Sequence, residues 1–457
     1  TRLFAVPPGS PRGVTSVLAC CHGPDRKPIP KMYKVFVAPL GLLCSAFSSC
    51  SLIIASSFPF HAWIRALIAR SMLSSSALIS VFSFAIFSTV SLALANNLIT
   101  SFIFYEILTL STFPLVAHHG NDKAKKGATT YLFILMSTSI VFFLVAIATT
   151  WVTQGSITYT NGGILSDNLG YPFFYGFLYA LFIFGVSKAA VMPFHKWLPA
   201  AMVAPTPVSA LLHAVAVVKA GVFGIIKVVV YIFGVDYLYD VPAVSILTGF
   251  AGFTIVFASY KALKSTNLKQ RLAYSTVSQL SYITMAASLA TPLAIAAAVF
   301  HLISHAFGKI TLFFAAGSLY TALHKTEVGE MRGVFYQMPI TMVCFALGAF
   351  SMIGLPPTVG LVSKWFIITG AVAVEDFFVL IILITSTILN AGYFLPIIYD
   401  AFFKKPLGYE NMEKVEDNNN FYHYRYLGNS EAPIFILFAI VITAMGVILT
   451  SFFAEHI

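Results

Sequence analysis

Long apolar stretches alternate with short polar segments along almost the whole chain. Twelve of these stretches are long enough to cross the hydrocarbon core of a bilayer, which takes about 20 helical residues. A transmembrane β-barrel would show shorter segments of alternating polarity, so the pattern predicts helices. The predicted spans are residues 35–57, 72–95, 97–116, 130–151, 172–193, 206–233, 241–259, 270–290, 292–322, 338–374, 376–402 and 432–453. We therefore expect an all-α polytopic membrane protein with about 12 transmembrane helices.

Lysine and arginine residues fall in every second connection between the predicted spans. They occur after the third, seventh and eleventh spans and at 324–332, whereas the connections 152–171, 234–240 and 375–376 contain none. Cytoplasmic loops of membrane proteins are enriched in these two residues. The alternation supports the list of spans and predicts that the basic connections face the cytoplasm. We expect a multi-pass protein of a cell membrane, with a bacterial inner membrane favoured.

The composition excludes several classes of protein. Hydrophobic residues make up 58% of the chain and charged residues 10%, whereas a soluble domain carries about 25% charged residues. The net charge of +10 is explained by the basic connections, and no basic patch interleaves with exposed aromatic residues, so nucleic-acid binding is not expected. The five cysteines form no CxxC pair, which leaves iron–sulfur and zinc sites without support. We expect no cofactor.

Ionisable side chains lie inside the predicted spans, where each charge costs roughly 2.5–3.5 kcal/mol on insertion scales. They are Glu106, Lys188, His213, Lys219, His301, His305, Lys309 and Lys364. A single buried lysine or histidine can simply join two helices by a hydrogen bond, and Lys227, near a span end, is better explained by snorkelling. So many such groups in one chain indicate a function instead. We expect a path for protons or small cations.

The histidines of one predicted span form the most specific local pattern. His301, His305 and Lys309 are four residues apart, so their side chains lie along one stripe of a helix. Histidine suits proton exchange because its ordinary pKa is near 6.5, and burial helps a lysine to release its proton. The two histidines could also bind a metal ion, but no carboxylate or cysteine accompanies them. A proton-exchanging stripe is therefore the favoured interpretation, and no metal site is expected.

Prolines interrupt two of the predicted spans next to a buried lysine. Pro193 follows Lys188 by five residues, and Pro356 and Pro357 precede Lys364 by eight and seven. Proline removes a helix hydrogen bond, and non-helical backbone at membrane depth is tolerated only beside protein or a water-filled cavity. The lysine precedes the proline in the first half of the chain and follows the prolines in the second half. An inverted repeat gives this order. Ordinary proline kinks are the alternative.

Five motifs, taken in order, resemble the antiporter-like membrane subunits shared by respiratory complex I and the Mrp-type cation/proton antiporters. The motifs are FYEILTLSTFPLV, SKAAVMPFHKWLPAAMVAPTPVSALLHAVAVVKAG, LKQRLAYSTVSQLSY, VFHLISHAFGKITLFFAAGS and GLPPTVGLVSKW, between residue 98 and about residue 375. The resemblance implies a fold of fourteen helices with two inverted five-helix repeats, each containing a discontinuous helix. We expect these repeats at 72–233 and 241–402.

The resemblance also implies roles for the buried ionisable groups. Glu106 is expected to pair with Lys188, and Lys364 to be the terminal proton-exchanging group. The central hydrophilic axis is expected to comprise Lys219, His301 and His305.

The beginning of the chain departs from the family pattern. The stretch FVAPLGLLCSAFSSC resembles the third helix of the family, so the usual first two helices are expected to be missing. Residues 1–33, rich in proline and glycine, are expected to be disordered or not the native beginning. We expect the first retained span and a basic loop at 34–71, and a polar loop and C-terminal helix at 403–457.

These features lead to one favoured function and several alternatives. The favoured function is proton or cation/proton translocation by the D-type subunit of an Mrp-type Na⁺/H⁺ antiporter, together with other membrane subunits. A proton-pumping subunit of an NADH-quinone oxidoreductase is the alternative, and a stand-alone solute transporter is less favoured. We expect no catalytic centre in this chain itself, and whether it serves an enzyme complex stays open. Whether Na⁺ or K⁺ moves as well as H⁺ also stays open.

Overall fold

The computed structural model describes residues 75–165, 172–239, 241, 243–406 and 430–453. The expectations for residues 1–33, for the first predicted span at 35–57 and for most of the polar segment 403–431 concern residues outside these ranges.

Within the described ranges the chain is almost entirely helical, and strand pairing is limited to two isolated bridges. The helices of the first half are α4 (Ser75–Leu94), α5 (Leu98–Val116), α6 (Asp122–Thr138), η1 (Ser139–Leu144), α7 (Val145–Gln154), α8 (Pro172–Gly185), η2 (Ser187–Ala189), η3 (Phe194–Lys196), α9 (Trp197–Ala200), η4 (Ala201–Val203), α10 (Thr206–Ala210), η5 (Leu211–Val215), α11 (Val217–Val228) and η6 (Val229–Phe233). Those of the second half are α12 (Val235–Tyr239), α13 (Ala243–Lys264), α14 (Leu268–Ser288), α15 (Pro292–Leu323), η7 (Val328–Met331), η8 (Val334–Tyr336), α16 (Pro339–Ile353), α17 (Val359–Ala373), α18 (Phe377–Phe403) and α20 (Ile434–Phe453). The expected all-α fold is confirmed.

Short polar connections start several of the long helices. The side chain of Asn97 accepts a hydrogen bond from the backbone N–H of Thr100, and Asn267 caps α14 in the same way. Such caps satisfy backbone groups that the first helical turn leaves without a partner. The polar residues between the apolar stretches therefore fix where the helices begin.

Most of the predicted spans correspond to helices of suitable length. Seven helices of the described chain are long and apolar enough to cross a membrane. The predicted span 130–151 is part of a longer helical run, Asp122–Gln154, because the chain continues as helix through η1. α14 is too polar for this group, although nearly all of its residues are buried among other helices. The predicted span 270–290 is thus an interior helix.

Both spans that were predicted to be interrupted are interrupted. α8 ends at Gly185, and the chain then forms the single turn η2, which carries Lys188, before it reaches α9. The second break separates α16 from α17, where Gly354 adopts the left-handed conformation (φ 89°) that favours glycine. The two breaks are as expected, whereas the grouping of the helices into inverted repeats stays a prediction.

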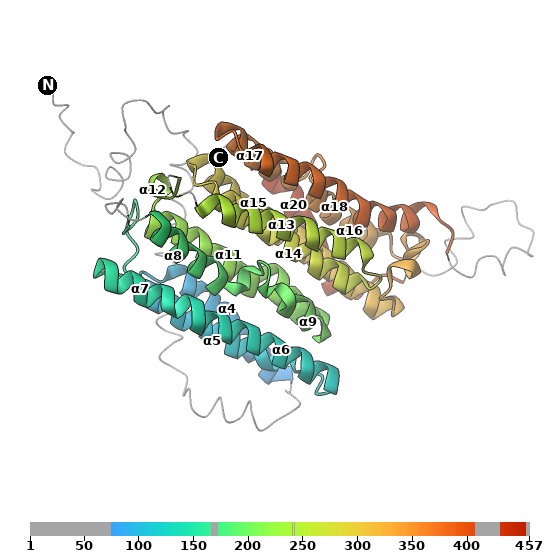
Figure 1. The fold of residues 1–457 in the computed structure, drawn as a ribbon. Helices are drawn as coiled ribbons and strands as arrows, with labels where there is room; N and C mark the ends of the chain where they lie inside the picture. Colours follow the sequence, from blue (N-terminus) through green and yellow to red (C-terminus); the bar gives the residue numbers. More distant parts are fainter. Residues whose placement is uncertain (1–74, 166–171, 240, 242, 407–429, 454–457) are drawn as a thin grey trace, which may run out of the picture.

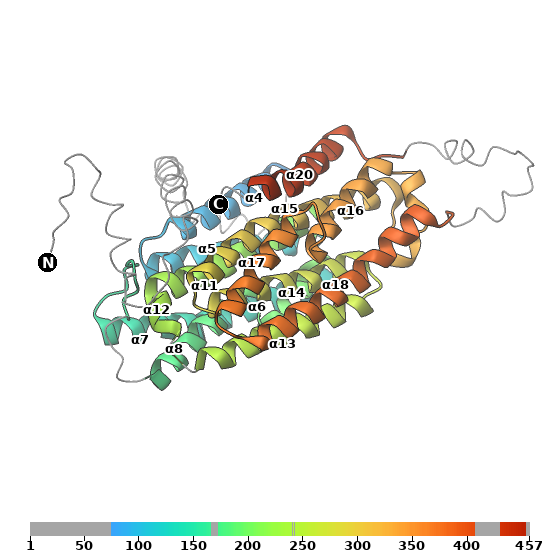
Figure 2. The ribbon, with the colours of Figure 1, turned by 90° about the horizontal axis from the view of Figure 1, so that it is seen from above.

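The helices run roughly side by side in one bundle (Figures 1 and 2), and in the view of Figure 1 the first half and the second half lie on opposite sides of it. α11 packs against α14 and α15, so it joins the two halves. α15 lies at the centre of the second half, in contact with α14, α16, α17 and α20. The residues between the two halves therefore come from α11, α14 and α15.

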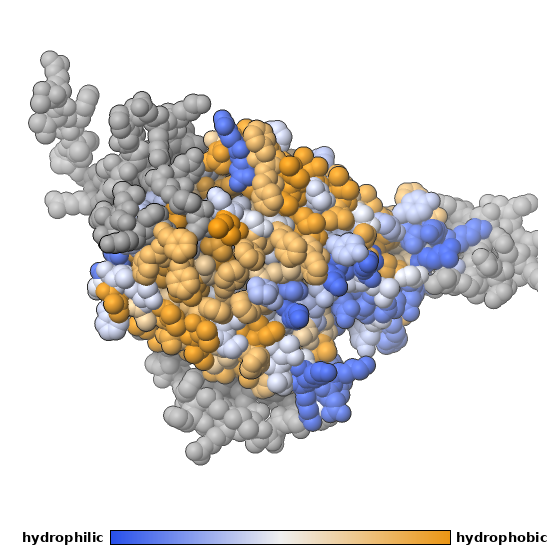
Figure 3. Space-filling model, in the orientation of Figure 1, coloured by the Kyte–Doolittle hydropathy of each residue, from blue (hydrophilic) through white to orange (hydrophobic). Residues whose placement is uncertain are grey.

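The basic connections share one end of this bundle. The connection before α14 pairs with the segment after α15, since Val328 N–H donates to Thr266 O (2.8 Å). The lysine-free connection before α5 pairs at the other end with the segment after α7, where Leu98 N–H donates to Ile157 O (3.1 Å). In Figure 3 hydrophobic side chains cover the middle of the molecule, and hydrophilic ones gather at the end where α6 begins.

Candidate functional site

Lys188 lies at the first break and is held by α5. Its side chain is fully buried. Nζ donates to Tyr105 O (2.8 Å) and to Thr109 Oγ1 (2.6 Å) and lies 3.0 Å from the centre of the Tyr105 ring. The backbone N–H of Lys188 donates to the Tyr105 hydroxyl (3.1 Å). Tyr105 and Thr109 are four residues apart and share a helix face, so one face of α5 holds both the amine and its backbone.

Glu106 follows Tyr105 on the same helix. Both of its carboxylate oxygens are buried, and within the described part of the chain no ion pair joins them to Lys188. The Lys188 amine instead contacts residues on either side of Glu106 in the sequence, so the two charges are neighbours without direct contact. Opposite charges attract strongly across short distances in apolar surroundings. The expected pairing therefore stays a prediction, and the geometry allows it through space.

Lys219 and His305 meet directly between α11 and α15. Nζ of Lys219 lies 2.5 Å from Nδ1 of His305 and donates to Leu302 O (3.1 Å). When the lysine is charged it can only donate, so Nδ1 of the imidazole must accept. When the proton has moved to Nδ1, the neutral amine accepts it back. This contact is a pair of groups between which a proton can move.

His301 lies one turn before His305 and contacts two further helices. Its Nε2 is 3.0 Å from Oε1 of Gln279 on α14, and its Nδ1 is 2.9 Å from Oγ of Ser363 on α17. An amide oxygen only accepts, so Nε2 of His301 carries the ring proton. Nδ1 can then accept a hydrogen bond from the Ser363 hydroxyl. Ser363 precedes Lys364, and His301 therefore connects the histidine stripe with the second break.

Lys364 takes its hydrogen-bond partners from the end of the broken helix. Nζ donates to Met352 O (3.1 Å) and Ile353 O (2.8 Å), with Thr387 Oγ1 at 3.3 Å. The last carbonyls of a helix have no partner inside it. Because α16 ends at Ile353, these carbonyls remain available to the buried amine. The break thus creates the binding site for Lys364.

A bridge of uncharged polar groups runs from Lys309 toward the same carbonyls. Lys309 Nζ donates to Ser275 Oγ (2.8 Å), and the Ser275 hydroxyl is 2.9 Å from the hydroxyl of Tyr393. Tyr393 donates to Asn390 Oδ1 (2.6 Å), and Asn390 Nδ2 donates to Met352 O (3.3 Å), which also accepts from Lys364. We call these three uncharged residues, Ser275, Tyr393 and Asn390, the polar bridge.

His213 lies apart from these contacts. It is fully buried in η5, its ring centre is 5.4 Å from that of Phe313, and neither ring nitrogen has a hydrogen-bond partner among the described residues. The residues described also contain no group of three or more His, Cys, Asp or Glu side chains placed to hold a metal ion. The structure therefore brings Lys219 to His305 and joins Lys309 through the polar bridge to a carbonyl that holds Lys364, whereas His213 has no such contact among the described residues.

Several functional candidates escape a search for charged and histidine side chains. The polar bridge contains neither, yet Asn390 and Tyr393 stand three residues apart in the largely apolar α18, a polar signal that the sequence does contain. Lys227 was interpreted as snorkelling. Its side chain is instead buried, and Nζ donates to Ala93 O (3.2 Å) and Ala95 O (2.6 Å) at the end of α4.

A bundle of membrane-length apolar helices that buries several lysines and histidines defines a multi-pass membrane protein with ionisable groups in its interior. Residues 95–389, more than half of the chain, match the family model "NADH:quinone oxidoreductase/Mrp antiporter, TM". The chain belongs to this family.

Two relatives and one solved structure illustrate the similarity. A probable K⁺/H⁺ antiporter subunit, of type A/B, from Rhizobium meliloti (strain 1021) is 34% identical over 279 residues, 60% of this chain and 27% of the relative. The NADH-quinone oxidoreductase subunit N of Desulforudis audaxviator (strain MP104C) is 28% identical over 366 residues, 79% of this chain and 71% of the relative. A chain of the membrane-bound sulfane sulfur reductase, an archaeal respiratory membrane complex, shares the fold with a TM-score of 0.69 and 24% identity, over 86% of this chain and 76% of that one.

These relatives differ in length from the present chain. The chain spans 27% of the first relative and 71% of the second. Both are subunits of larger assemblies by their names, so the family is one of membrane-complex subunits.

Proposed function

We propose that this chain is the ion-translocating, antiporter-like subunit of a multisubunit complex in a bacterial inner membrane, and that it moves protons, alone or in exchange for Na⁺ or K⁺. The contact between Lys219 and His305 supports this function most directly. Two groups that can both accept and release a proton lie there within hydrogen-bond distance, inside an apolar bundle. Two permanently charged structural cations would repel each other in this position.

Proton transfer through His305 uses both nitrogens of its ring. Lys219 gives its proton to Nδ1, and the imidazole then passes the proton carried by Nε2 to His301, the next carrier in our proposal. We place Lys188 before Lys219 in this sequence, because the backbone of η2, which carries Lys188, packs directly on Gly221 of α11, two residues beyond Lys219. The proposed order of proton carriers is Lys188, Lys219, His305, His301 and Lys364.

Glu106 and the polar bridge regulate this sequence in our proposal. The carboxylate of Glu106 stabilises the charged form of the neighbouring Lys188, so it favours loading of a proton at the first break. At the second break the polar bridge joins Lys309 to the carbonyls that hold Lys364. The charged form of Lys188 is therefore stabilised by a carboxylate, whereas the charged form of Lys364 is stabilised by the dipoles of backbone carbonyls.

Two kinds of complex fit this function. We favour a D-type subunit of an Mrp-type Na⁺/H⁺ antiporter, on the motifs SALLHA and VVKAG together with Lys364. The match over 79% of the chain to a subunit N supports the alternative, a proton-pumping subunit of an NADH-quinone oxidoreductase. In both cases the partners are other membrane subunits.

The test uses the assembled complex, purified with its partner subunits and reconstituted in liposomes. Proton flux is measured with a Na⁺ or K⁺ gradient as driving force and, separately, with NADH and a quinone. Lys364→Ala should abolish nearly all flux, whereas Lys404→Ala, a matched change at a half-exposed lysine paired with Asp400, should leave it unchanged. Absence of flux in the wild-type complex under every driving force would contradict the proposal, and robust exchange by the isolated chain would contradict the need for partners.

A further inference from the structure

The segment that follows α7, residues 156–165, crosses the end of the bundle opposite the basic connections. One of its edges pairs with the connection before α5. Leu98 N–H donates to Ile157 O (3.1 Å), and Tyr159 N–H donates to Asn96 O (3.0 Å). We call residues 156–165 the strap. Its first part is thus fixed to the start of α5, the helix that holds the Lys188 amine.

The second part of the strap is fixed to the end of the helical run α11–η6. The backbone N–H groups of Ile164 and Leu165 both donate to Ile232 O (2.9 and 3.0 Å). Gly163 lies so close to Gly234 that a Cβ on Gly163 would be 2.4 Å from the Gly234 nitrogen. The strap therefore joins the start of α5 to the end of η6 through its backbone, and it has no room to shift at Gly163.

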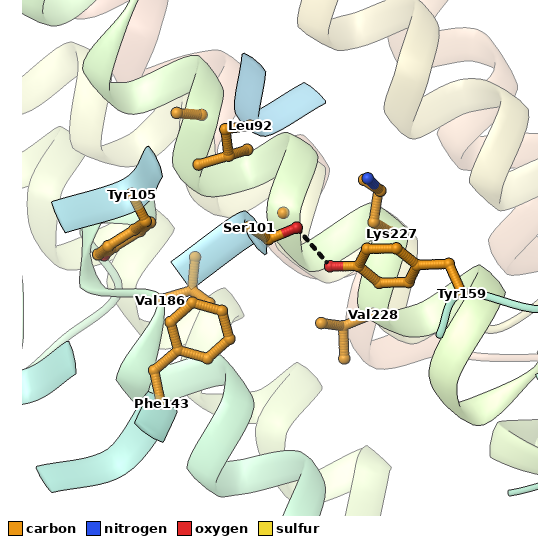
Figure 4. A pocket seen from close by; sticks show the side chains of 10 residues that line it. Leu92, Ser101, Tyr105, Phe143, Tyr159, Val186, Lys227 and Val228 are labelled. Carbon is orange, nitrogen blue, oxygen red and sulfur yellow. Dashed lines mark hydrogen bonds between the residues drawn. The ribbon is translucent and has the colours of Figure 1, made fainter. Parts of the chain in front are cut away.

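Tyr159 extends from the strap into the space between α5 and α11 (Figure 4). Its hydroxyl is 2.9 Å from the hydroxyl of Ser101 on α5. On the other side, the centre of its ring is 4.1 Å from Nζ of Lys227 on α11. The tyrosine side chain therefore fills the opening between the two helices at this end of the bundle.

Behind Tyr159 lies a small cavity whose walls are mostly apolar (Figure 4). They include Leu92, Phe143 and Val186, and Lys188 is not among the described residues that line it. Its volume would hold about one water molecule, but small apolar cavities stay dry. Moving a charge through a dry apolar gap is costly. The interior between the strap and Lys188 is thus a poor route for protons.

We propose that the strap is a fixed seal that closes the first half of the bundle at this end, with Tyr159 as its plug. A proton on Lys188 then leaves only toward Lys219, and protons from the compartment beyond the strap do not reach Lys188. Backbone hydrogen bonds on both edges keep the strap in one position during transport. The inference rests on the proposed function, because it excludes one exit from the same proton path.

The first test displaces the strap in the assembled complex, reconstituted in liposomes. Gly162 and Gly163 have nearly the same positive φ (88° and 92°), so alanine strains the backbone alike at both positions. Only at Gly163 would the new Cβ overlap backbone atoms, whereas at Gly162 it meets no described atom within 4 Å. Gly163→Ala should raise the passive proton leak several-fold above that of Gly162→Ala, without a cation gradient and without NADH. An equal leak in the two variants would overturn the seal.

The second test removes the plug and leaves the backbone of the strap in place. Tyr159→Ala deletes the ring between α5 and α11, so the passive leak should again rise several-fold. Tyr159→Phe keeps the ring and loses only the contact with the Ser101 hydroxyl, so its leak should stay close to that of wild type. This pair decides the question even if Gly163→Ala does not assemble. A complex that carries Tyr159→Ala and stays as tight as wild type would refute the plug.

The third test asks whether the strap has to move. Asn97 and Thr158 face each other in an antiparallel bridge, with its hydrogen bonds on either side of the pair. Cα atoms in such pairs are about 4.5 Å apart, within the range of roughly 4.4–6.8 Å that a disulfide spans. Asn97→Cys with Thr158→Cys, in a variant without native cysteines, should therefore form a disulfide on oxidation. Gradient-driven flux should be the same in the oxidised and reduced forms. Flux that is lost on oxidation and restored by reduction would show a moving gate instead of a fixed seal.

Failure of the seal can be distinguished from failure of the proposed function. The leak is measured without any driving force, whereas the function is measured as driven flux in the wild-type complex. Driven flux in wild type together with tight Gly163→Ala and Tyr159→Ala complexes would reject the seal alone. Absence of driven flux in wild type would reject the function, and the seal with it.

Discussion

Replacing Lys219 by arginine separates a role in proton transfer from a role that needs only a positive charge. Arginine keeps the charge but does not release a proton in the accessible pH range. We predict that Lys219→Arg lowers proton flux nearly as much as Lys219→Ala, measured in the reconstituted complex at matched protein levels. Lys227→Arg is the control, since it places the same substitution on the same helix at a lysine outside the proposed order of proton carriers. Near-normal flux in Lys219→Arg would rule out proton transfer to His305.

Glu106 provides the second test at this scale. Glu106→Gln removes the negative charge beside Lys188 while keeping the size of the side chain, so we expect a strong loss of flux. Glu106→Asp keeps the charge and should be partly tolerated. The control is Asp122→Asn, which neutralises an exposed carboxylate in the first turn of α6. Wild-type flux in Glu106→Gln, at normal assembly, would show that the carboxylate has no part in transport.

Residue patterns predicted which groups are buried more reliably than which groups touch. The stripe of His301, His305 and Lys309 was visible because the helical period is a local property of the sequence. The partners of these side chains are not local: Lys219 lies 86 positions from His305, and Tyr393 lies 118 positions from Ser275. Such contacts depend on how the helices pack, and the pattern of one helix does not contain that information.

At the level of helices, α18 contributes through two uncharged residues. Tyr393→Phe keeps the ring, which packs 4.7 Å from that of Phe394, and removes the hydroxyl between Ser275 and Asn390. We predict a several-fold fall in flux and a loss of about 1 kcal/mol in stability, the usual contribution of one buried hydrogen bond.

Tyr399→Phe on the same helix is the matched control, because its side chain is 57% exposed. Thermal unfolding in detergent and flux in liposomes should both single out position 393. If the two variants transport equally well, the polar bridge is a scaffold without a role in proton movement.

The helices themselves were predictable to different degrees. The predicted span 292–322 and α15 (Pro292–Leu323) agree almost residue for residue, because a long apolar run between a capping threonine and a polar loop leaves little choice. Both breaks were predicted from prolines, yet the availability of the Met352 and Ile353 carbonyls was not. That consequence follows only once Lys364 folds back onto the end of α16.

For the whole molecule, the two ends of the bundle should face opposite compartments. In a variant without native cysteines, Cys introduced at Lys125 and at Lys404 should react with a membrane-impermeant thiol reagent from the cytoplasmic side. Cys at Thr160, in the lysine-free segment after α7, should react only from the other side. Labelling of all three positions from one side would refute the topology.

α14 has a consequence for how the protein is made. This helix is buried almost throughout and too polar to enter lipid favourably as a single segment. Its extensive packing on α13, across a connection of three residues, offers the polar side chains partners at once. During synthesis α14 should therefore enter the bilayer together with α13, as a helical hairpin, rather than as a single segment. The interior position that serves the native protein thus sets the order of its membrane integration.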